Sequence, residues 1–392
     1  KRRLYAVLCL ISLILGMLVK LSFVLVIAAL AVDLAIRYWR KGYRRAVYAT
    51  GIGLVLLPLL IIGFIWLLAR ALPLFDFGIM IEHARGYLRF SGRNYGQIAY
   101  QLFKAFLYLS PLLVIPVLFA RRQILARLRP LVLYLGLAFI FYIVLFDFSS
   151  AALDKYLMVA IMPLSVVSGA VLAQVQGNSA SRRWLISGLV VAVFLIFVQF
   201  LPHAIPPLYP KGEWLGRVLK LQWNILIPFM GGSGPMGFYA SWLFMAVAWI
   251  VAVGAGILGM IRKNMASVRP FILVVGIVYS AIMLSELLFG YPHGSSKKVL
   301  NDALEYIKRT PSVESVITFN DTGGYYLNKM GKYERRMFAV PKYEKLYRDI
   351  LNNHQGHLLV VDIPQIYQDS VYWRHISSCR PEFVSRSGYI SA

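Results

Sequence analysis

The chain has 392 residues, of which 59% are hydrophobic, and it carries a formal net charge of +24. Its apolar side chains exceed what the core of one soluble domain could bury, which excludes an ordinary soluble protein and indicates an integral membrane protein. The positive charge does not indicate nucleic acid, because Lys and Arg occur in short clusters between apolar runs, the pattern that orients membrane proteins.

Nine apolar runs follow one another along the first part of the chain, and each is a candidate membrane segment. They cover residues 4–19, 21–36, 46–70, 99–120, 130–146, 154–174, 184–201, 237–261 and 270–288. Basic clusters fall at every second connection, at 1–3, 37–45, 121–129, 182–183 and 262–269. One alternating topology therefore places all of these clusters, and the N-terminus, in the cytoplasm. The loops 71–98 and 202–236 and everything after about 290 are expected on the extracytoplasmic side of the plasma membrane.

Lys20 separates the first two apolar runs. As a single helix, residues 4–36 would extend roughly 50 Å, more than the roughly 30 Å hydrocarbon core of a bilayer. Such a helix would also place the first two basic clusters on opposite sides of the membrane. A hairpin of two short helices that turns near Lys20 keeps both clusters inside. The turn then places the ammonium group of Lys20 at the level of the external lipid phosphates.

The last hundred residues change character, with charges of both signs and apolar runs of strand length. Strands are predicted at 313–319, 335–340 and 357–362, and helices at 298–309 and 341–353. This alternation indicates a small α/β domain with a mostly parallel sheet. The predicted fold is therefore a polytopic α-helical membrane protein, with a transmembrane domain at 1–289 and an extracytoplasmic α/β domain at 290–392. The external loop before the eighth apolar run is expected to carry a helix on the membrane surface.

Two groups of external side chains could bind an anionic lipid phosphate. Arg85, Arg89 and Arg93 are spaced to share one face of a helix, and guanidinium groups bind oxyanions in a forked geometry. Lys155 and Tyr156 begin a predicted membrane segment, where an ammonium and a phenol could both donate to a phosphate. Each group has a simpler interpretation, because arginines extend to lipid headgroups and Lys and Tyr anchor helix ends at the membrane surface.

Groups suited to catalysis are few. Glu82 and Asp154 are the in-chain candidates for a general acid or base, and a further expectation is that this group is supplied by residues before Lys1. A divalent metal often assists such a reaction, but no two external carboxylates stand at ligand spacing and the two cysteines form no zinc motif. No nucleotide-binding or hydrolase motif occurs, and His203 is expected to be an isolated loop histidine.

Three stretches, in this order, resemble the GT-C glycosyltransferases that use polyprenyl-phosphate sugars, especially the protein mannosyltransferase and aminoarabinose transferase group. They are "LILGMLVKLSFVLVIAALAVDLAIRYWRKGYRR" (13–45), "FLYLSPLLVIPVLFARR" (106–122) and "LDKYLMVAIMPLSVVSGAVLA" (153–173). The family usually follows its lysine with Gly or Pro, whereas Leu21 and Ser22 follow Lys20. Its later prolines tend to come earlier than Pro163.

The resemblance implies an enzyme that transfers a sugar from a polyprenyl-phosphate donor to an acceptor on the outer membrane face. Lys20, Lys155 and Tyr156 would then bind the donor phosphate, and Arg85 and Arg89 would guide its lipid. The acceptor stays open between protein, lipid and glycan, and membrane lipids are the other partners.

Two further classes of protein fit the sequence. One is a non-catalytic membrane subunit whose external α/β domain binds a partner protein. The other is a transporter, which needs ionisable side chains at a site near the middle of the membrane. Only Asp33 and Glu286 are candidates for such a site, and both lie near the ends of predicted segments.

Overall fold

A computed structural model describes most of the chain from Phe23 onward. The described ranges are 23–71, 93–145, 158–174, 181–204, 212–230, 236–262, 265–290, 292–319, 323–337, 344–361, 370–384 and 390–391, together with positions 4, 8, 11, 12, 15, 16 and 78. The chain divides into two compact units. The first combines residues 1–106 and 116–174, and the second combines residues 107–115 and 175–392.

The first unit is helical. Its elements are α2 (Val24–Arg40), α3 (Arg44–Ala71), most of α5 (Tyr95–Tyr108), α7 (Arg122–Arg127), α8 (Arg129–Ile140), a π-helical turn (Phe141–Leu145), a 3-10 turn (Met158–Ala160) and α10 (Ile161–Ala173). A buried cluster joins α2, α5 and α8 through Leu25, Ile98, Ala105, Ala138 and Tyr142. These helices fall within or next to the predicted apolar runs, because long runs of apolar residues favour helices whose polar backbone groups are satisfied internally.

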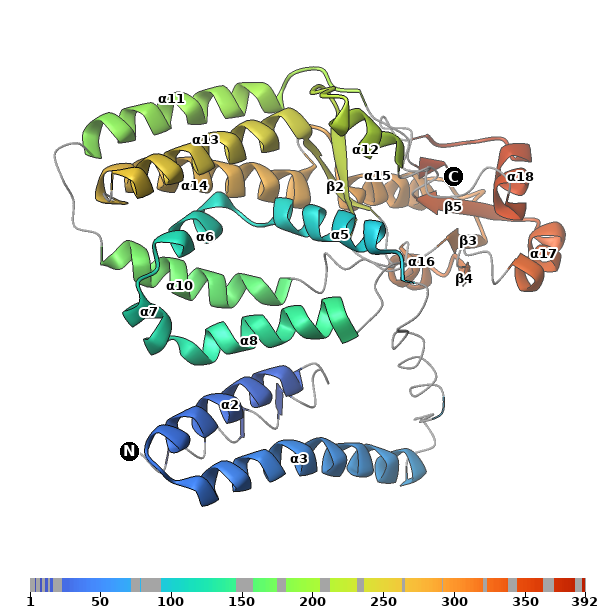
Figure 1. Cartoon of the computed structure of the whole chain (residues 1–392). Coiled ribbons are helices and arrows are strands. Elements are labelled where there is room, and N and C mark those ends of the chain that lie inside the picture. Colours follow the sequence, from blue (N-terminus) through green and yellow to red (C-terminus); the bar gives the residue numbers. More distant parts are fainter. Residues whose placement is uncertain are drawn as a thin grey trace. The chain divides into compact units, whose positions relative to one another are not determined.

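Three long helices of the second unit lie side by side (Figure 1). They are α11 (Ser181–Gln199), α13 (Trp242–Ile261) and α14 (Met265–Phe289). Within the described residues, three helices are long and apolar enough to cross a membrane: Arg182–Gln199, Trp242–Ile261 and Ala266–Phe289. A fourth span results if Ile98–Tyr108 and Pro111–Phe119, which are bent by 95° at a short break, count as one. This fold is compatible with a membrane protein.

The break in the bent pair is fixed on α14. The hydroxyl group of Ser110 donates to the carbonyl oxygen of Gly276 at 2.9 Å and also accepts from the backbone amide of Leu112, so that Ser110 caps the short helix α6 (Pro111–Val114). A Cβ atom at Gly276 would lie 2.4 Å from the Cβ atom of Leu112. Glycine therefore allows α6 to approach the backbone of α14, and the hydroxyl group of Ser110 is a second side-chain donor to a carbonyl oxygen that also accepts from the hydroxyl group of Ser280 at 2.8 Å.

A β-hairpin precedes α13, and the sequence analysis did not predict it. Strands β1 (Leu226–Met230) and β2 (Met236–Ser241) pair antiparallel, so the expected membrane segment at 237–261 begins as a strand and becomes helical only at Trp242. A bridge between Phe238 and Ser295 connects β2 with the residue that precedes helix α15 (Ser296–Arg309). The short helix α12 (Gly212–Leu219) lies within the stretch where a surface helix was expected.

The C-terminal α/β segment (residues 296–391) contains a four-stranded sheet. Its elements are α15 (Ser296–Arg309), β3 (Val316–Phe319), α16 (Gly324–Lys329), β4 (Tyr333–Met337), α17 (Glu344–Asn353), β5 (His357–Val361), α18 (Val371–Ser378) and β6 (Ile390–Ser391). The strand order is β4-β3-β5-β6, with β3 parallel to β4 and β5, and β6 antiparallel to β5. The segment belongs to the same compact unit as α11, α13 and α14.

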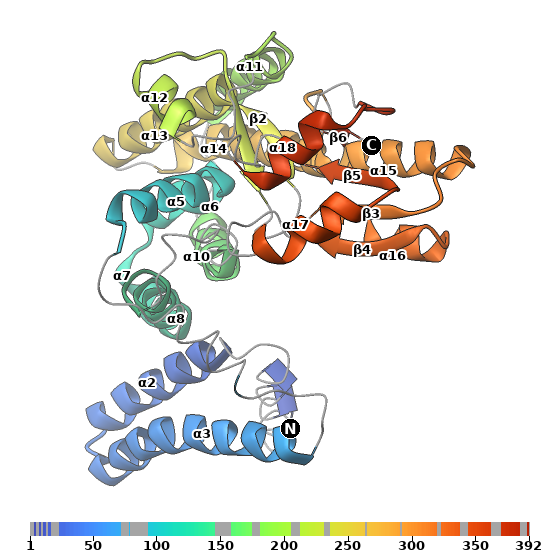
Figure 2. The ribbon, with the colours of Figure 1, turned by 90° about the vertical axis from the view of Figure 1, so that its right-hand side faces the viewer.

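Helices cover both faces of this sheet (Figure 2). Residues of α15 and α16 pack with Val316 and Leu359 on one face, and residues of α17 and α18 pack with Ile317 and Val360 on the other. Neighbouring residues of one strand therefore contribute to opposite cores, as the two-residue period of a strand requires.

Candidate functional site

The donor-site residues and the in-chain catalytic candidates proposed from the sequence lie outside the described residues. They are Lys20, Glu82, Arg85, Arg89, Asp154, Lys155 and Tyr156. The expected donor site and the in-chain catalytic acids therefore stay predictions. The loop at 71–98, which was expected to be external, is described only at Ala71, Gly78 and from Arg93 onward.

Arg93, the described member of the arginine stripe, contacts the backbone rather than projecting freely. Its guanidinium group donates to the carbonyl oxygens of Val144 at 2.5 Å and Leu145 at 3.1 Å. These carbonyls belong to the last turn of the π-helical segment, where backbone acceptors lack helical partners. A cation at a helix C-terminus is stabilising, so Arg93 fixes this helix end.

Asp33 takes part in a buried ion-pair network in the first unit. Its carboxylate accepts from Arg37 at 2.7 Å within α2 and from Arg129 at the start of α8. The whole residue is only 3% exposed. Because two guanidinium groups compensate this buried charge, the contacts explain Asp33 as a connection between α2 and α8. They do not favour a transport site.

The most extensive buried polar cluster among the described residues, here called the polar junction, lies in the second unit. It consists of Gln199, His203, Ser241, Glu286 and His293. Gln199 ends α11, Ser241 precedes α13, and Glu286 lies in the last turn of α14. His203 and His293 follow α11 and α14. The junction therefore collects one end of each of the three apolar helices.

Glu286 is the fully buried centre of the polar junction. One carboxylate oxygen accepts from the side-chain amide of Gln199 at 2.8 Å, and both oxygens lie 3.3–3.4 Å from the backbone N–H of His293. These donors compensate the cost of removing the carboxylate from water. The side-chain oxygen of Gln199 is buried and has no hydrogen-bond partner among the described residues. It is a buried acceptor that a water molecule or a ligand could still use.

The two histidines of the junction have defined proton positions. Nε2 of His293 lies 2.7 Å from the carbonyl oxygen of Gln199, so this nitrogen carries the hydrogen. Nδ1 of His203 faces the carbonyl oxygen of Leu201, which leaves Nε2 to accept from the hydroxyl group of Ser241. The two imidazole rings lie 5.0 Å apart, edge to face.

This pairing of Ser241 with His203 has the composition of a catalytic dyad but a structural geometry. Ser241 is completely buried, and its oxygen also accepts from the backbone N–H of Phe244. The serine therefore caps the N-terminus of α13. A nucleophile must reach its substrate, which this position does not allow.

Burial keeps both histidines neutral at physiological pH. It lowers the pKa of His203, against the opposing effect of the Leu201 carbonyl. Burial also lowers the pKa of His293 to about 4, although the Gln199 carbonyl opposes the change and the neighbouring His203 adds to it. In this state the rings act as fixed hydrogen-bonding groups. A general base for neutral pH would need a higher pKa than His293 has.

The lowered pKa of His293 predicts acid-sensitive stability. The unfolded chain binds this proton near pH 6.5 and the folded chain only near pH 4, so stability is complete above about 6.5 and falls as the pH falls towards 4. Because the ring is partly exposed, we expect a loss of roughly 1–2 kcal/mol. The measurement is the melting temperature of the detergent-solubilised chain between pH 7.5 and 4.5.

The matched variant for this measurement is His293→Gln, which retains a donor at the position of Nε2 and cannot be protonated. Its melting temperature is expected to fall less steeply with acid than that of the unchanged chain. His203 and His375, whose pKa values burial also lowers, contribute to the remaining slope. Identical slopes for the two proteins would contradict the assignment.

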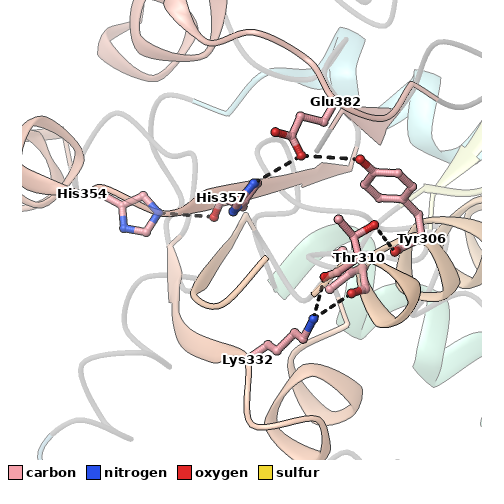
Figure 3. A network of polar contacts seen from close by, with 7 residues as sticks. Tyr306, Thr310, Lys332, His354, His357 and Glu382 are labelled. Carbon is pink, nitrogen blue, oxygen red and sulfur yellow. Dashed lines mark hydrogen bonds and ion pairs between the residues drawn. The ribbon is translucent and has the colours of Figure 1, made fainter. Parts of the chain in front are cut away.

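A second polar network fastens the C-terminal α/β segment (Figure 3). Lys332 donates to the carbonyl oxygens of Ile307 and Thr310 at the end of α15, at 2.9 and 3.0 Å. At the start of β5, Nε2 of His357 lies 3.3 Å from the carboxylate of Glu382, which also accepts from Tyr306. The lysine thus satisfies terminal helix carbonyls, and the carboxylate joins the chain near 382 to the sheet.

This network lies at the edge of the sheet opposite to the usual ligand position. Lys332 and His357 stand at the beginnings of the parallel strands β4 and β5. Ligands of open parallel sheets bind outside the carboxyl ends of the strands instead. Residues 320–322, 338–343 and 362–369, which follow those ends, lie outside the described residues. Within the described part, no three His, Cys, Asp or Glu side chains are arranged to hold a metal ion.

Sequence reasoning missed the polar junction because its members are far apart in the chain. Gln199 and Glu286 are separated by 87 positions, and each ends an apolar run where a polar residue attracts little notice. The expectation that His203 is isolated was wrong, since it contacts both Ser241 and His293. The sequence did contain one signal for this cluster. Glu286 is an ionisable residue within an apolar run, three residues before the end of α14, and such residues often mark a polar site.

Comparison with protein families, with curated proteins and with solved structures finds no match to this chain.

Proposed function

We propose that this protein is a membrane glycosyltransferase that moves a sugar from a polyprenyl-phosphate donor to an acceptor on the extracytoplasmic face. In this proposal the basic clusters face the cytoplasm, nine segments cross or enter the membrane, and the C-terminal α/β segment forms an extracytoplasmic domain. The donor lipid lies in the bilayer, and its phosphate contacts Lys20, Lys155 and Tyr156.

The observation that carries the proposal is the position of the polar junction. It gathers the ends of α11, α13 and α14, and α15 begins three residues after His293, so the junction and the C-terminal α/β segment follow the same end of the apolar helices. Sugar transfer from a lipid carrier needs polar groups at one surface of a hydrophobic helix assembly. The junction supports such a surface by fixing the helix ends.

A phosphate held between two cationic side chains at the membrane surface is bound far more strongly than in bulk water, because the local dielectric constant is low. The phenol of Tyr156 would add a hydrogen bond to the same oxyanion. Arg85 and Arg89 would contact the lipid on its way to the site. Transfer then requires removal of a proton from the acceptor hydroxyl group, for which Glu82 and Asp154 are the in-chain candidates.

Donor binding tests the proposal directly. The detergent-solubilised chain should retain a polyprenyl phosphate in a binding assay. Lys20→Gln, Lys155→Gln and Tyr156→Phe should each weaken that binding, with at least about a tenfold loss for each lysine, since each removes a charge or donor from a low-dielectric site. Lys297→Gln, which removes an exposed charge from α15, is the matched control and should leave binding unchanged.

Transfer of sugar to an acceptor is the second readout. If Glu82→Gln or Asp154→Asn abolishes transfer while donor binding persists, that carboxylate is the general base. Absence of donor binding by the folded chain, or equal losses in the Lys297 control, would overturn the donor site and with it the enzyme.

One observation favours the alternative of a non-catalytic membrane subunit. Most polar groups of the junction satisfy one another, since Glu286 accepts from Gln199 and from the backbone of His293, and Ser241 caps α13. Such mutual satisfaction is typical of a structural cluster. In that case the C-terminal α/β segment binds a partner protein, and the folded chain retains no polyprenyl phosphate.

A further inference from the structure

The connection between α2 and α3 is a rigid, basic turn. Gly42 has a φ of +78° and follows the last residues of α2. The backbone N–H of Tyr43 donates to the carbonyl oxygen of Tyr38 at 3.0 Å, and that of Gly42 donates to Trp39 at 3.0 Å. These two bonds define a Schellman motif, in which glycine supplies the left-handed residue. The turn therefore presents its side chains in a fixed arrangement.

An open pocket of about 630 Å³ lies at this turn. It is lined by Tyr38, Gly42, Tyr43, Arg44, Arg45 and Ala46. The rings of Tyr38 and Tyr43 meet edge to face at 6.4 Å, which is the side-chain contact that accompanies a Schellman turn. The pocket thus combines two phenol groups with two guanidinium groups, and both kinds of group donate hydrogen bonds to oxyanions.

The two arginines are uncompensated in the part of the chain that the structure describes. No carboxylate there lies within ion-pair distance of Arg44 or Arg45, whereas Arg37, one helical turn before the pocket, is paired with Asp33. Both residues are exposed and stand in the first turn of α3, which contains no acidic residue. Cations at a helix N-terminus are unfavourable, because they are repelled by the positive end of the helix dipole. A bound anion would relieve this repulsion and also the repulsion between the two guanidinium groups.

The surface of α3 beyond the pocket is apolar and exposed. Its described side chains include Ile52, Leu56, Leu59, Leu60, Phe64 and Leu67, all at least half exposed. Tyr48, 66% exposed, lies between this apolar surface and the arginines, in the position that aromatic residues favour at a membrane surface. An exposed apolar helix surface of this length is suited to contact with lipid chains. The anion that reaches Arg44 and Arg45 from beside this surface is therefore a lipid headgroup.

We propose that the α2–α3 turn is a specific binding site for the phosphate group of an anionic membrane phospholipid, with its acyl chains along α3. Arg44 and Arg45 bind the phosphate oxygens in a forked geometry, and Tyr38 and Tyr43 donate at the rim. A guanidinium group suits this role because it offers planar paired donors, unlike the point charge of an ammonium group. The site is independent of the donor site proposed above, which uses other residues.

Native mass spectrometry of the detergent-solubilised full chain tests this site. Titration with phosphatidylglycerol should show one preferentially retained lipid, and phosphatidylcholine should compete poorly. The double variant Arg44→Gln/Arg45→Gln should weaken retention at least about tenfold, since each basic residue near a membrane surface contributes substantially to attraction of an anionic lipid. The matched control Arg121→Gln/Arg122→Gln removes the same charge from another exposed basic pair and should change retention little.

Two further experiments distinguish a specific binding site from general electrostatic attraction of anionic lipids. Arg44→Lys/Arg45→Lys conserves the charge and removes the forked donors, so retention should still fall about fivefold or more. This variant also keeps the test decisive if the glutamine variant fails to fold. Inorganic phosphate at about 10 mM, which adds little ionic screening, should not displace the lipid. Free phosphate has no acyl chains and therefore makes no contacts with the apolar surface of α3. Full retention by the lysine variant, equal loss in the control, or displacement by phosphate would each overturn the lipid site.

Discussion

Glu286→Ala is expected to lower the free energy of unfolding by about 3 kcal/mol, the largest effect of any single substitution in the polar junction. The carboxylate is fully buried and accepts from the side-chain amide of Gln199 and the backbone N–H of His293. Its removal leaves both donors without a side-chain acceptor at a buried position. A buried unsatisfied donor costs more than an average hydrogen bond contributes.

Thermal unfolding of the detergent-solubilised chain measures this effect. Glu286→Gln retains one acceptor oxygen at nearly the same position, so it should recover part of the loss. Glu305→Ala, which removes an exposed carboxylate from α15, is the control and should shift stability by less than about 0.5 kcal/mol. If the two alanine variants unfolded at the same temperature, Glu286 would not be the centre of the junction.

Gly276→Ala should destabilise the second unit by about 1–3 kcal/mol through overpacking. The new Cβ atom would lie 2.4 Å from the Cβ atom of Leu112 and 2.9 Å from its backbone nitrogen. Backbone atoms cannot move aside as a flexible side chain can, so α6 or α14 must shift. The shift would also strain the hydrogen bond from Ser110 to the carbonyl oxygen of Gly276.

A second glycine in an apolar helix provides the comparison. Gly254 lies in α13, and a Cβ atom there would meet nothing within 4 Å. Gly254→Ala should therefore raise stability, by up to about 1 kcal/mol, because alanine favours the helix more than glycine does. Opposite signs for the two substitutions, read from the same melting experiment, are the expected result. A stabilising effect at Gly276 would show that the contact with Leu112 is not tight.

The apolar runs predicted where most helices lie, because apolar composition and length are local properties of the sequence. The predicted strands at 313–319 and 357–362 likewise contain β3 and β5. The hairpin of β1 and β2 was missed since its strands are short and uniformly apolar, without the alternation that distinguishes a strand from the start of a buried helix. Among the described residues, three helices are long and apolar enough to cross a membrane. The larger number of nine membrane segments stays a prediction.

The polar junction could not be predicted, for a different reason. Its contacts join Gln199 to Glu286 and His203 to Ser241, and each pair is brought together only by the packing of separate helices. Single-sequence patterns carry information about neighbouring positions and none about such distant partners. The ion pair of Arg37 with Asp33 shows the contrast, because its i, i+4 spacing could be read from the sequence.

The contact between Ser110 and Gly276 also has a consequence for the order of events during synthesis. Its partners are 166 positions apart, and residues 107–115 belong to a compact unit whose other members begin at 175. At roughly 5–20 residues per second, a ribosome needs about 10–30 s to make the intervening chain. During that interval the Ser110–Pro111 break has no α14 to pack against. A factor that shields nascent membrane segments would be needed for that time, and slowing translation between 120 and 275 should increase the fraction of chains that are degraded.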